Sequence, residues 1–109
     1  MAVYLLHSDE PLLRSDGTPV VHYVGHAPDG EVHRRLADHL RGRHPARLVQ
    51  AFLERGATLL LGNVWMGEGR DYERRLKQMG HLNRRCYVCR LNALRAEWYE
   101  RIGDEPLLS

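Results

Sequence analysis

Several features are absent from this sequence, and each absence excludes a class of protein. No apolar run approaches the length of a membrane-spanning helix. The N-terminal stretch MAVYLLHSDE has neither the basic segment nor the long apolar core of a signal peptide. Cysteine is limited to Cys86 and Cys89, so a disulfide-stabilised secreted fold is not expected. We therefore expect a cytoplasmic protein in a reducing setting, with no membrane association.

Lysine is also scarce, because Lys77 is the only one and arginine supplies the other positive charges. The planar guanidinium of arginine suits bidentate contacts to phosphate. The formal net charge is only +2, but between Arg34 and Arg47 five arginines stand against one acid, Asp38. This clustering is typical of a surface that binds a polyanion, and equally of a solvated helix face.

The length and composition predict one folded domain. The chain has 109 residues, of which 43% are hydrophobic and 28% are charged, which is enough for one core and too little for two. We expect a single domain over residues 1–109. Its core covers residues 2–79, and a basic CxxC loop and a C-terminal helix occupy residues 80–109.

Hydrophobic periodicity and turn residues predict an α+β fold with a small three-stranded antiparallel sheet flanked by helices. The third strand is almost continuously apolar, which predicts a central position covered on both faces. Gly25 marks a turn or a close approach of the backbone. The order is strand–strand–helix–helix–strand–helix–helix, with strands at 3–6, 20–24 and 57–66, and helices at 31–41, 45–55, 71–79 and 91–102.

Four short motifs occur in a characteristic order. Ala2-Val3-Tyr4 is followed by Tyr23-Val24-Gly25, then by Arg35-Leu36 with His39 four positions after the arginine, and then by the run from Glu73 to Lys77. This ordered set resembles the GIY-YIG nucleases over residues 2–77, about two thirds of the chain. The first motif lacks the glycine of that family and keeps the tyrosine.

The resemblance implies a role for each matching residue. Glu73 would hold one divalent metal, Mg²⁺ or Mn²⁺, and Arg35 would brace the oxygens of the scissile phosphate. Tyr4 is favoured as the general base and Tyr23 as the group that orients water, although the sequence does not separate the two. His39 would order this catalytic group, and His26 could assist.

The function implied is a stand-alone endonuclease that hydrolyses DNA, with a protein partner as one possible source of specificity. An alternative is a nucleic-acid-binding module on the same scaffold without catalysis. Each residue also has a purely structural explanation, such as packing for the tyrosines or an i,i+4 ion pair for Glu73 and Lys77. The residues expected to contact nucleic acid are His26, Arg34, Arg41, Arg43, Lys77, Arg84 and Arg85.

The cysteine pair raises a separate question. Cys86 and Cys89 have the CxxC spacing of half a zinc site, and His81 is the nearest further ligand. No fourth ligand is evident nearby, so two reduced thiols are favoured over bound zinc. The alternative is a zinc-stabilised interaction protein organised around this pair.

Overall fold

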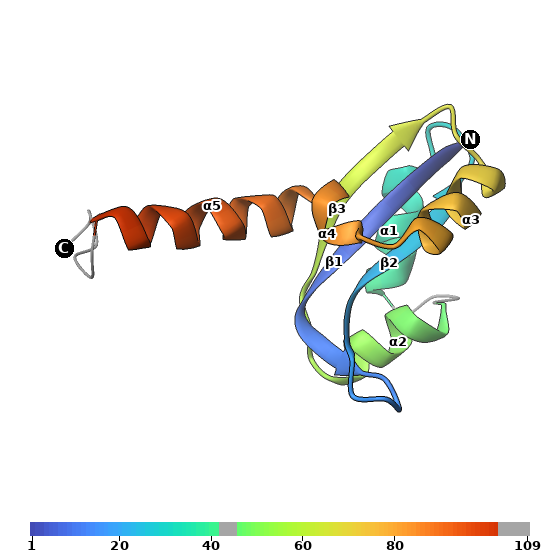
Figure 1. Ribbon diagram of the computed structural model, residues 1–109. Coiled ribbons are helices and arrows are strands. Elements are labelled where there is room, and N and C mark those ends of the chain that lie inside the picture. Colours follow the sequence, from blue (N-terminus) through green and yellow to red (C-terminus); the bar gives the residue numbers. More distant parts are fainter. Residues whose placement is uncertain (42–45, 103–109) are drawn as a thin grey trace.

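The chain forms one sheet with helices on both of its faces (Figure 1). The computed structural model describes residues 1–41 and 46–102, and the side chains of residues 1–41 and 46–98. The predicted start of the second helix at Pro45, the predicted contact residue Arg43, and residues 103–109 lie outside these ranges. The elements are β1 (Ala2–Leu13), β2 (Pro19–Ala27), α1 (Val32–Leu40), α2 (Arg47–Glu54), β3 (Leu59–Met66), α3 (Arg70–Met79), α4 (Leu82–Arg85) and α5 (Tyr87–Ile102).

These elements confirm the predicted α+β fold, the antiparallel three-stranded sheet and the order of strands and helices. One local difference is that the predicted basic loop at 80–89 contains the short helix α4 and the first turn of α5. Cys86 therefore directly precedes α5, and Cys89 lies within its first turn.

The central strand is β1, because the sheet order is β2-β1-β3. Residues Ala2–Ser8 of β1 are all buried. The predicted central position of the third strand is therefore wrong: β3 is an edge strand, and its Leu60 and Leu61 are 45% and 43% exposed. An apolar run shows that a segment favours a strand, but it does not show how many neighbours that strand has.

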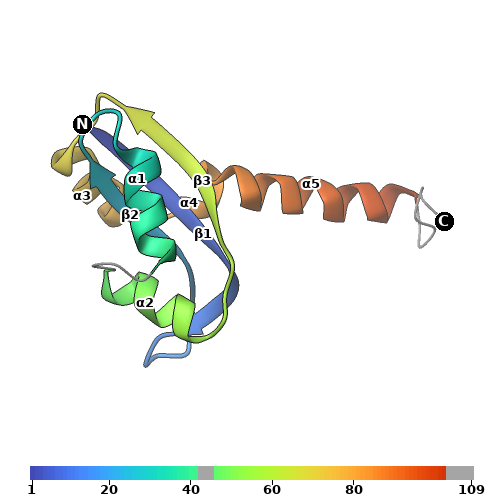
Figure 2. The same ribbon diagram turned by 180° about the vertical axis from the view of Figure 1, so that it is seen from behind.

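The two faces of the sheet carry separate cores, because successive side chains of a strand point to opposite faces. On one face Ala2, Tyr4 and Leu6 of β1 pack with residues of α1 and α2. On the other face Val3 and Leu5 pack with residues of α3, α4 and α5. Figure 2, seen from behind, shows α1 in front of the sheet, whereas α3 is in front in Figure 1.

Helix α3 is anchored on β2 and β1 by Leu76, whose side chain is fully buried. Burial of a leucine contributes about 1.5–3 kcal/mol relative to exposure, which fixes the rotation of this helix. Helix α5 extends away from the sheet (Figure 1) and leaves Leu91, Leu94 and Trp98 exposed. Among the described residues, no helix combines the length and the apolar character needed to cross a membrane.

Candidate functional site

The two predicted catalytic tyrosines lie together at the β1–β2 pair. Tyr4 is directly opposite Gly25 in the antiparallel register, and the ring centroids of Tyr4 and Tyr23 are 6.3 Å apart. A Cβ added at Gly25 would lie 2.6 Å from Cζ of Tyr4 and 2.9 Å from Cε1 of Tyr23. Gly25 therefore provides the space that the Tyr4 ring occupies. Of the two predicted roles of this glycine, the close approach is the one observed, since β2 continues to Ala27.

Helix α1 contributes a histidine to the same place. Nε2 of His39 and the Tyr4 hydroxyl are joined by a hydrogen bond of 2.7 Å, and both residues are buried. The imidazole also meets the Tyr23 ring edge-on, with centroids 5.7 Å apart. Burial and then the charge of Arg35 lower the pKa of His39, so its ring is neutral. A neutral imidazole held by a buried phenol is a fixed orienting group.

Ionisation of the two phenols is opposed by their surroundings. Burial and then Tyr23 raise the pKa of Tyr4, while Arg35 partly counters this rise. Burial raises the pKa of Tyr23 as well, and the charges of Lys77 and Arg35 act in the opposite direction. Tyr4 is only 1% exposed, whereas Tyr23 is half-buried. The phenol that solvent can reach is therefore that of Tyr23.

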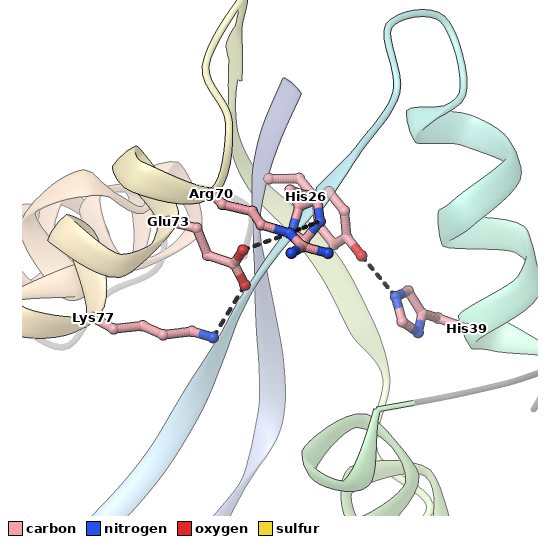
Figure 3. Close-up of polar contacts among 6 residues, drawn as sticks. His26, His39, Arg70, Glu73 and Lys77 are labelled. Carbon is pink, nitrogen blue, oxygen red and sulfur yellow. Dashed lines mark hydrogen bonds and ion pairs between the residues drawn. The ribbon is translucent and has the colours of Figure 1, made fainter. Parts of the chain in front are cut away.

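Glu73 of α3 faces β2, where both of its carboxylate oxygens have partners (Figure 3). Oε2 accepts a hydrogen bond of 2.6 Å from Nδ1 of His26, and Oε1 accepts one of 3.1 Å from Nζ of Lys77. Nε of Arg70 donates to the other His26 nitrogen over 3.4 Å. Burial raises the pKa of Glu73, but the hydrogen bonds from Lys77 and His26 outweigh it, so the pKa lies below its ordinary value.

These groups meet at the free edge of β2. Glu73 and Arg35 come from opposite faces of the sheet, yet the charges of both act on the pKa values of Tyr4 and Tyr23. Because β2 is an edge strand and Gly25 has no side chain, groups from the two faces approach each other there. Tyr4, Tyr23 and His39 are in contact, and the charges of Arg35 and Glu73 act on the pKa values of both phenols. These five residues, which are the predicted catalytic residues, are here called the tyrosine site.

The predicted nucleic-acid contacts are not all on one surface. His26 and Lys77 adjoin the tyrosine site through Glu73, and Arg34 and Arg41 are exposed on or next to α1. Arg84 and Arg85 belong to α4, which packs on the opposite face of the sheet. The described arginines that were predicted to contact nucleic acid therefore divide into two groups, one on or next to α1 and one on α4.

A second polar group lies on the α3 side of the sheet and is here called the His/Cys cluster: His7, His22, Cys86 and Cys89. The four candidate ligand atoms, one per residue, all lie within 4.8 Å of one another. His7 and His22 are directly opposite in the β1–β2 register. Burial and then His7 lower the pKa of His22 to about 4, and burial and then Cys86 raise the pKa of Cys89 to about 11.

The predicted cofactor, Mg²⁺ or Mn²⁺, is therefore wrong. Among the described residues, the group that gathers metal-type ligands is the His/Cys cluster, and it offers nitrogen and sulfur. Hard cations prefer several oxygen ligands, whereas imidazole and thiolate suit zinc. The residues at Glu73 do not fit a cation either, because His26 and Lys77 already engage both oxygens of this one carboxylate.

The expected zinc partner of the cysteines is also different. His81 is exposed and does not belong to the cluster, whereas His7 and His22, which the sequence analysis missed, do. A partial signal was available: His22 lies in the predicted strand at 20–24, His7 directly follows the predicted strand at 3–6, and the CxxC pair lacked two ligands. No protein-family model, curated protein or solved structure matches this chain.

Proposed function

We propose that the chain binds the sugar–phosphate backbone of DNA at the tyrosine site, on a scaffold that resembles the GIY-YIG nucleases. The observation that carries this proposal is the convergence of residues from four separate elements on the edge of β2. Tyr4 comes from β1, Tyr23 from β2, Arg35 and His39 from α1, and Glu73 from α3. Short sequence motifs that match by accident have no reason to meet in space.

The charges around the site suit a phosphate. Arg35 is exposed, and Lys77 and Arg70 approach from α3. Arg35, Arg70 and Lys77 supply three positive charges, against the carboxylate of Glu73 and that of Asp38, which acts on His39. An exposed guanidinium beside phenol hydroxyls can donate to two phosphate oxygens at once. The affinity of such a site falls steeply as salt concentration rises.

Phosphodiester hydrolysis at the same place is a second candidate function, favoured by the unequal exposure of the two phenols. Tyr4 is buried against His39, so its hydroxyl is an orienting group rather than a base. Tyr23 is the accessible phenol. Burial raises its pKa, and the charges of Lys77 and Arg35 counter only part of that rise, so the phenolate needed for proton transfer is a minor form. This assignment reverses the roles favoured from the sequence. In the reaction a water oxygen attacks phosphorus, Tyr23 as phenolate takes the water proton, and the leaving oxygen is protonated by solvent.

The binding proposal is tested by the fluorescence anisotropy of labelled double-stranded and branched DNA over a range of salt concentrations. We expect Arg35→Ala and Lys77→Ala each to weaken binding by about 3- to 30-fold and to flatten the salt dependence. Arg14→Ala is the matched control, because Arg14 is an exposed arginine in the β1–β2 turn, beyond the far end of β1. Equal losses in all three variants would contradict a specific site.

Cleavage is measured on supercoiled plasmid, with and without added divalent salt. Tyr23→Phe keeps the ring and removes only the hydroxyl, so it should abolish nicking while DNA binding changes little. Nicking that continues unchanged in both Tyr23→Phe and Arg35→Ala would rule out catalysis at this site. If the wild-type protein binds DNA without nicking it, the binding function is retained and the catalytic function is rejected.

A further inference from the structure

We infer that His7, His22, Cys86 and Cys89 bind one structural Zn²⁺ ion that ties the start of α5 to the β1–β2 hairpin. This inference does not depend on the proposed function, because the four residues are separate from the tyrosine site. It rests on the distances among their ligand atoms, on their burial, and on the space that the sheet leaves for one of them.

Four of the six distances among the ligand atoms match the edges of a zinc tetrahedron, and all six are within 4.8 Å. Bonds of about 2.3 Å to sulfur and about 2.0–2.1 Å to nitrogen at tetrahedral angles place S and N about 3.5 Å apart, and two nitrogens about 3.4 Å apart. Nδ1 of His7 is 3.5 Å from Sγ of Cys86 and 3.4 Å from Sγ of Cys89. Nε2 of His22 is 3.3 Å from Sγ of Cys89 and 3.4 Å from Nδ1 of His7.

Hydrogen bonding alone does not account for these contacts. A ring nitrogen of a neutral imidazole has either one proton or one lone pair in the ring plane, so it makes one well-directed hydrogen bond. Three atoms surround Nδ1 of His7: Sγ of Cys86, Sγ of Cys89 and Nε2 of His22. At most one of these three contacts can be a good hydrogen bond. An ion at the common centre would satisfy all four ligand atoms together.

The positions of the residues are those of a built site. Cys86 is fully buried, His7 is 8% exposed, and neither cysteine forms a disulfide. The sheet also makes room for the Cys86 thiol: a Cβ added at Gly62 of β3 would lie 2.8 Å from Sγ of Cys86 and 3.3 Å from the Leu5 carbonyl oxygen. Gly62 thus leaves space for the Cys86 thiol, just as Gly25 leaves space for the Tyr4 ring.

The ligand set defines both the metal and its role. Two imidazoles and two thiolates form a tetrahedral N₂S₂ site, for which zinc is the usual occupant. All four positions are filled by protein, so no place remains for water or substrate, and the role is structural. His7 and Cys86 are 79 positions apart. A metal that closes so long a loop constrains the unfolded chain strongly, and it fixes the direction in which α5 leaves the sheet.

The test uses the full chain without a polyhistidine tag, produced in zinc-supplemented medium and purified without chelator. Mass spectrometry of the metal content should find about one zinc per chain. Replacement by Co²⁺ should give the intense visible bands of a tetrahedral site, with sulfur-to-metal charge transfer that confirms thiolate ligands. Both measurements use the wild-type protein, so neither depends on whether a variant folds.

Variants then identify the ligands. Cys89→Ser and His22→Ala alter half-buried residues, and each should weaken zinc binding by at least about tenfold in competition with a chromophoric chelator. His81→Asn is the matched control, because His81 lies near the cysteines in sequence, is outside the cluster, and has a left-handed backbone that asparagine tolerates. Zinc binding should not change in this control.

Three results would overturn the inference. The first is a folded wild-type chain that binds less than about 0.1 zinc per chain after reconstitution. The second is zinc binding that survives unchanged in both Cys89→Ser and His22→Ala. The third is an iron or copper ion in place of zinc in the purified protein.

Discussion

The tyrosine site and the His/Cys cluster are built on the same two strands but are completed in different ways. Tyr23 and His22 are neighbours on β2, and alternation along the strand sends them to opposite faces. The tyrosine site is held by direct contacts, such as the 2.7 Å bond between Tyr4 and His39. The His/Cys cluster instead has more close contacts than hydrogen bonds can satisfy. Direct hydrogen bonds account for the contacts in one group, and the inferred zinc ion would account for those in the other.

The two groups also differ in their access to solvent. Tyr23 is half-buried and Arg35 is exposed, so an extended polyanion can reach the tyrosine site. Cys86 and His7 are buried, and the four candidate ligand atoms of the cluster lie within 4.8 Å of one another. This contrast is consistent with the proposed recognition at one group and the proposed structural zinc at the other. It predicts that each group can be damaged while the other keeps its function.

Removal of the metal should have the largest effect. Stripping the ion with a strong zinc chelator should lower the free energy of unfolding by about 3 kcal/mol or more and the Tm by about 10 °C or more. Circular dichroism melts measure the loss. Hydrogen exchange should accelerate most in α4 and the first turn of α5, which the ion ties to the hairpin. An unchanged Tm in a chain shown to have lost its zinc would remove the structural role.

Substitution of alanine for Gly25 or for Gly62 should impair only one of the two functions, DNA binding in the first case and zinc binding in the second. Gly25→Ala places a Cβ 2.6 Å from the packed Tyr4 ring, so it should destabilise the fold by about 1–3 kcal/mol and weaken DNA binding, with zinc content intact. Gly62→Ala crowds Sγ of Cys86 at 2.8 Å, so it should weaken zinc binding by about tenfold and spare DNA binding.

Anisotropy and metal analysis on the same preparations measure both outcomes. Gly69→Ala is the control, because its nearest neighbour is the sulfur of the flexible Met1 side chain at 3.4 Å. If either glycine variant impaired both functions equally, the two groups would not be independent.

The pH dependence of stability should show the smallest effect. Burial and then Arg35 hold the pKa of His39 below its ordinary value of 6.5, so the folded chain binds this proton more weakly than the unfolded chain. The stabilisation from neutral His39 is therefore complete above pH 6.5 and is lost as the pH falls toward the folded-state pKa.

The predicted loss of stability at low pH can be checked by urea unfolding of wild type and His39→Gln at about pH 7.5 and about pH 5.5. Wild type should lose more stability than the variant between the two values. The comparison between the two proteins is needed because acid would also release the inferred zinc ion from both of them. A larger loss in His39→Gln would reverse the interpretation of His39 as a buried neutral ring.

The sequence was informative where function depends on local pattern. Periodicity located the helices that carry Arg35, His39 and Glu73, and three of the residues that the motifs selected, Tyr4, Tyr23 and His39, are in contact. The sequence did not predict features that depend on contacts between residues far apart in the chain. The apolar run of β3 did not show that the strand is at an edge, and Cys86 and Cys89 did not show which histidines accompany them.

The sequence by itself determined the α+β class, the order of the elements and the residue types available for chemistry, because these follow from short-range periodicity and composition. Only the tertiary structure decided which of those residues are partners. The register of β1 against β2 places His7 opposite His22 and Tyr4 opposite Gly25, and the packing of α3 and α5 adds Glu73 to one group and the cysteines to the other. Such pairings depend on contacts between distant segments, which local propensities do not encode.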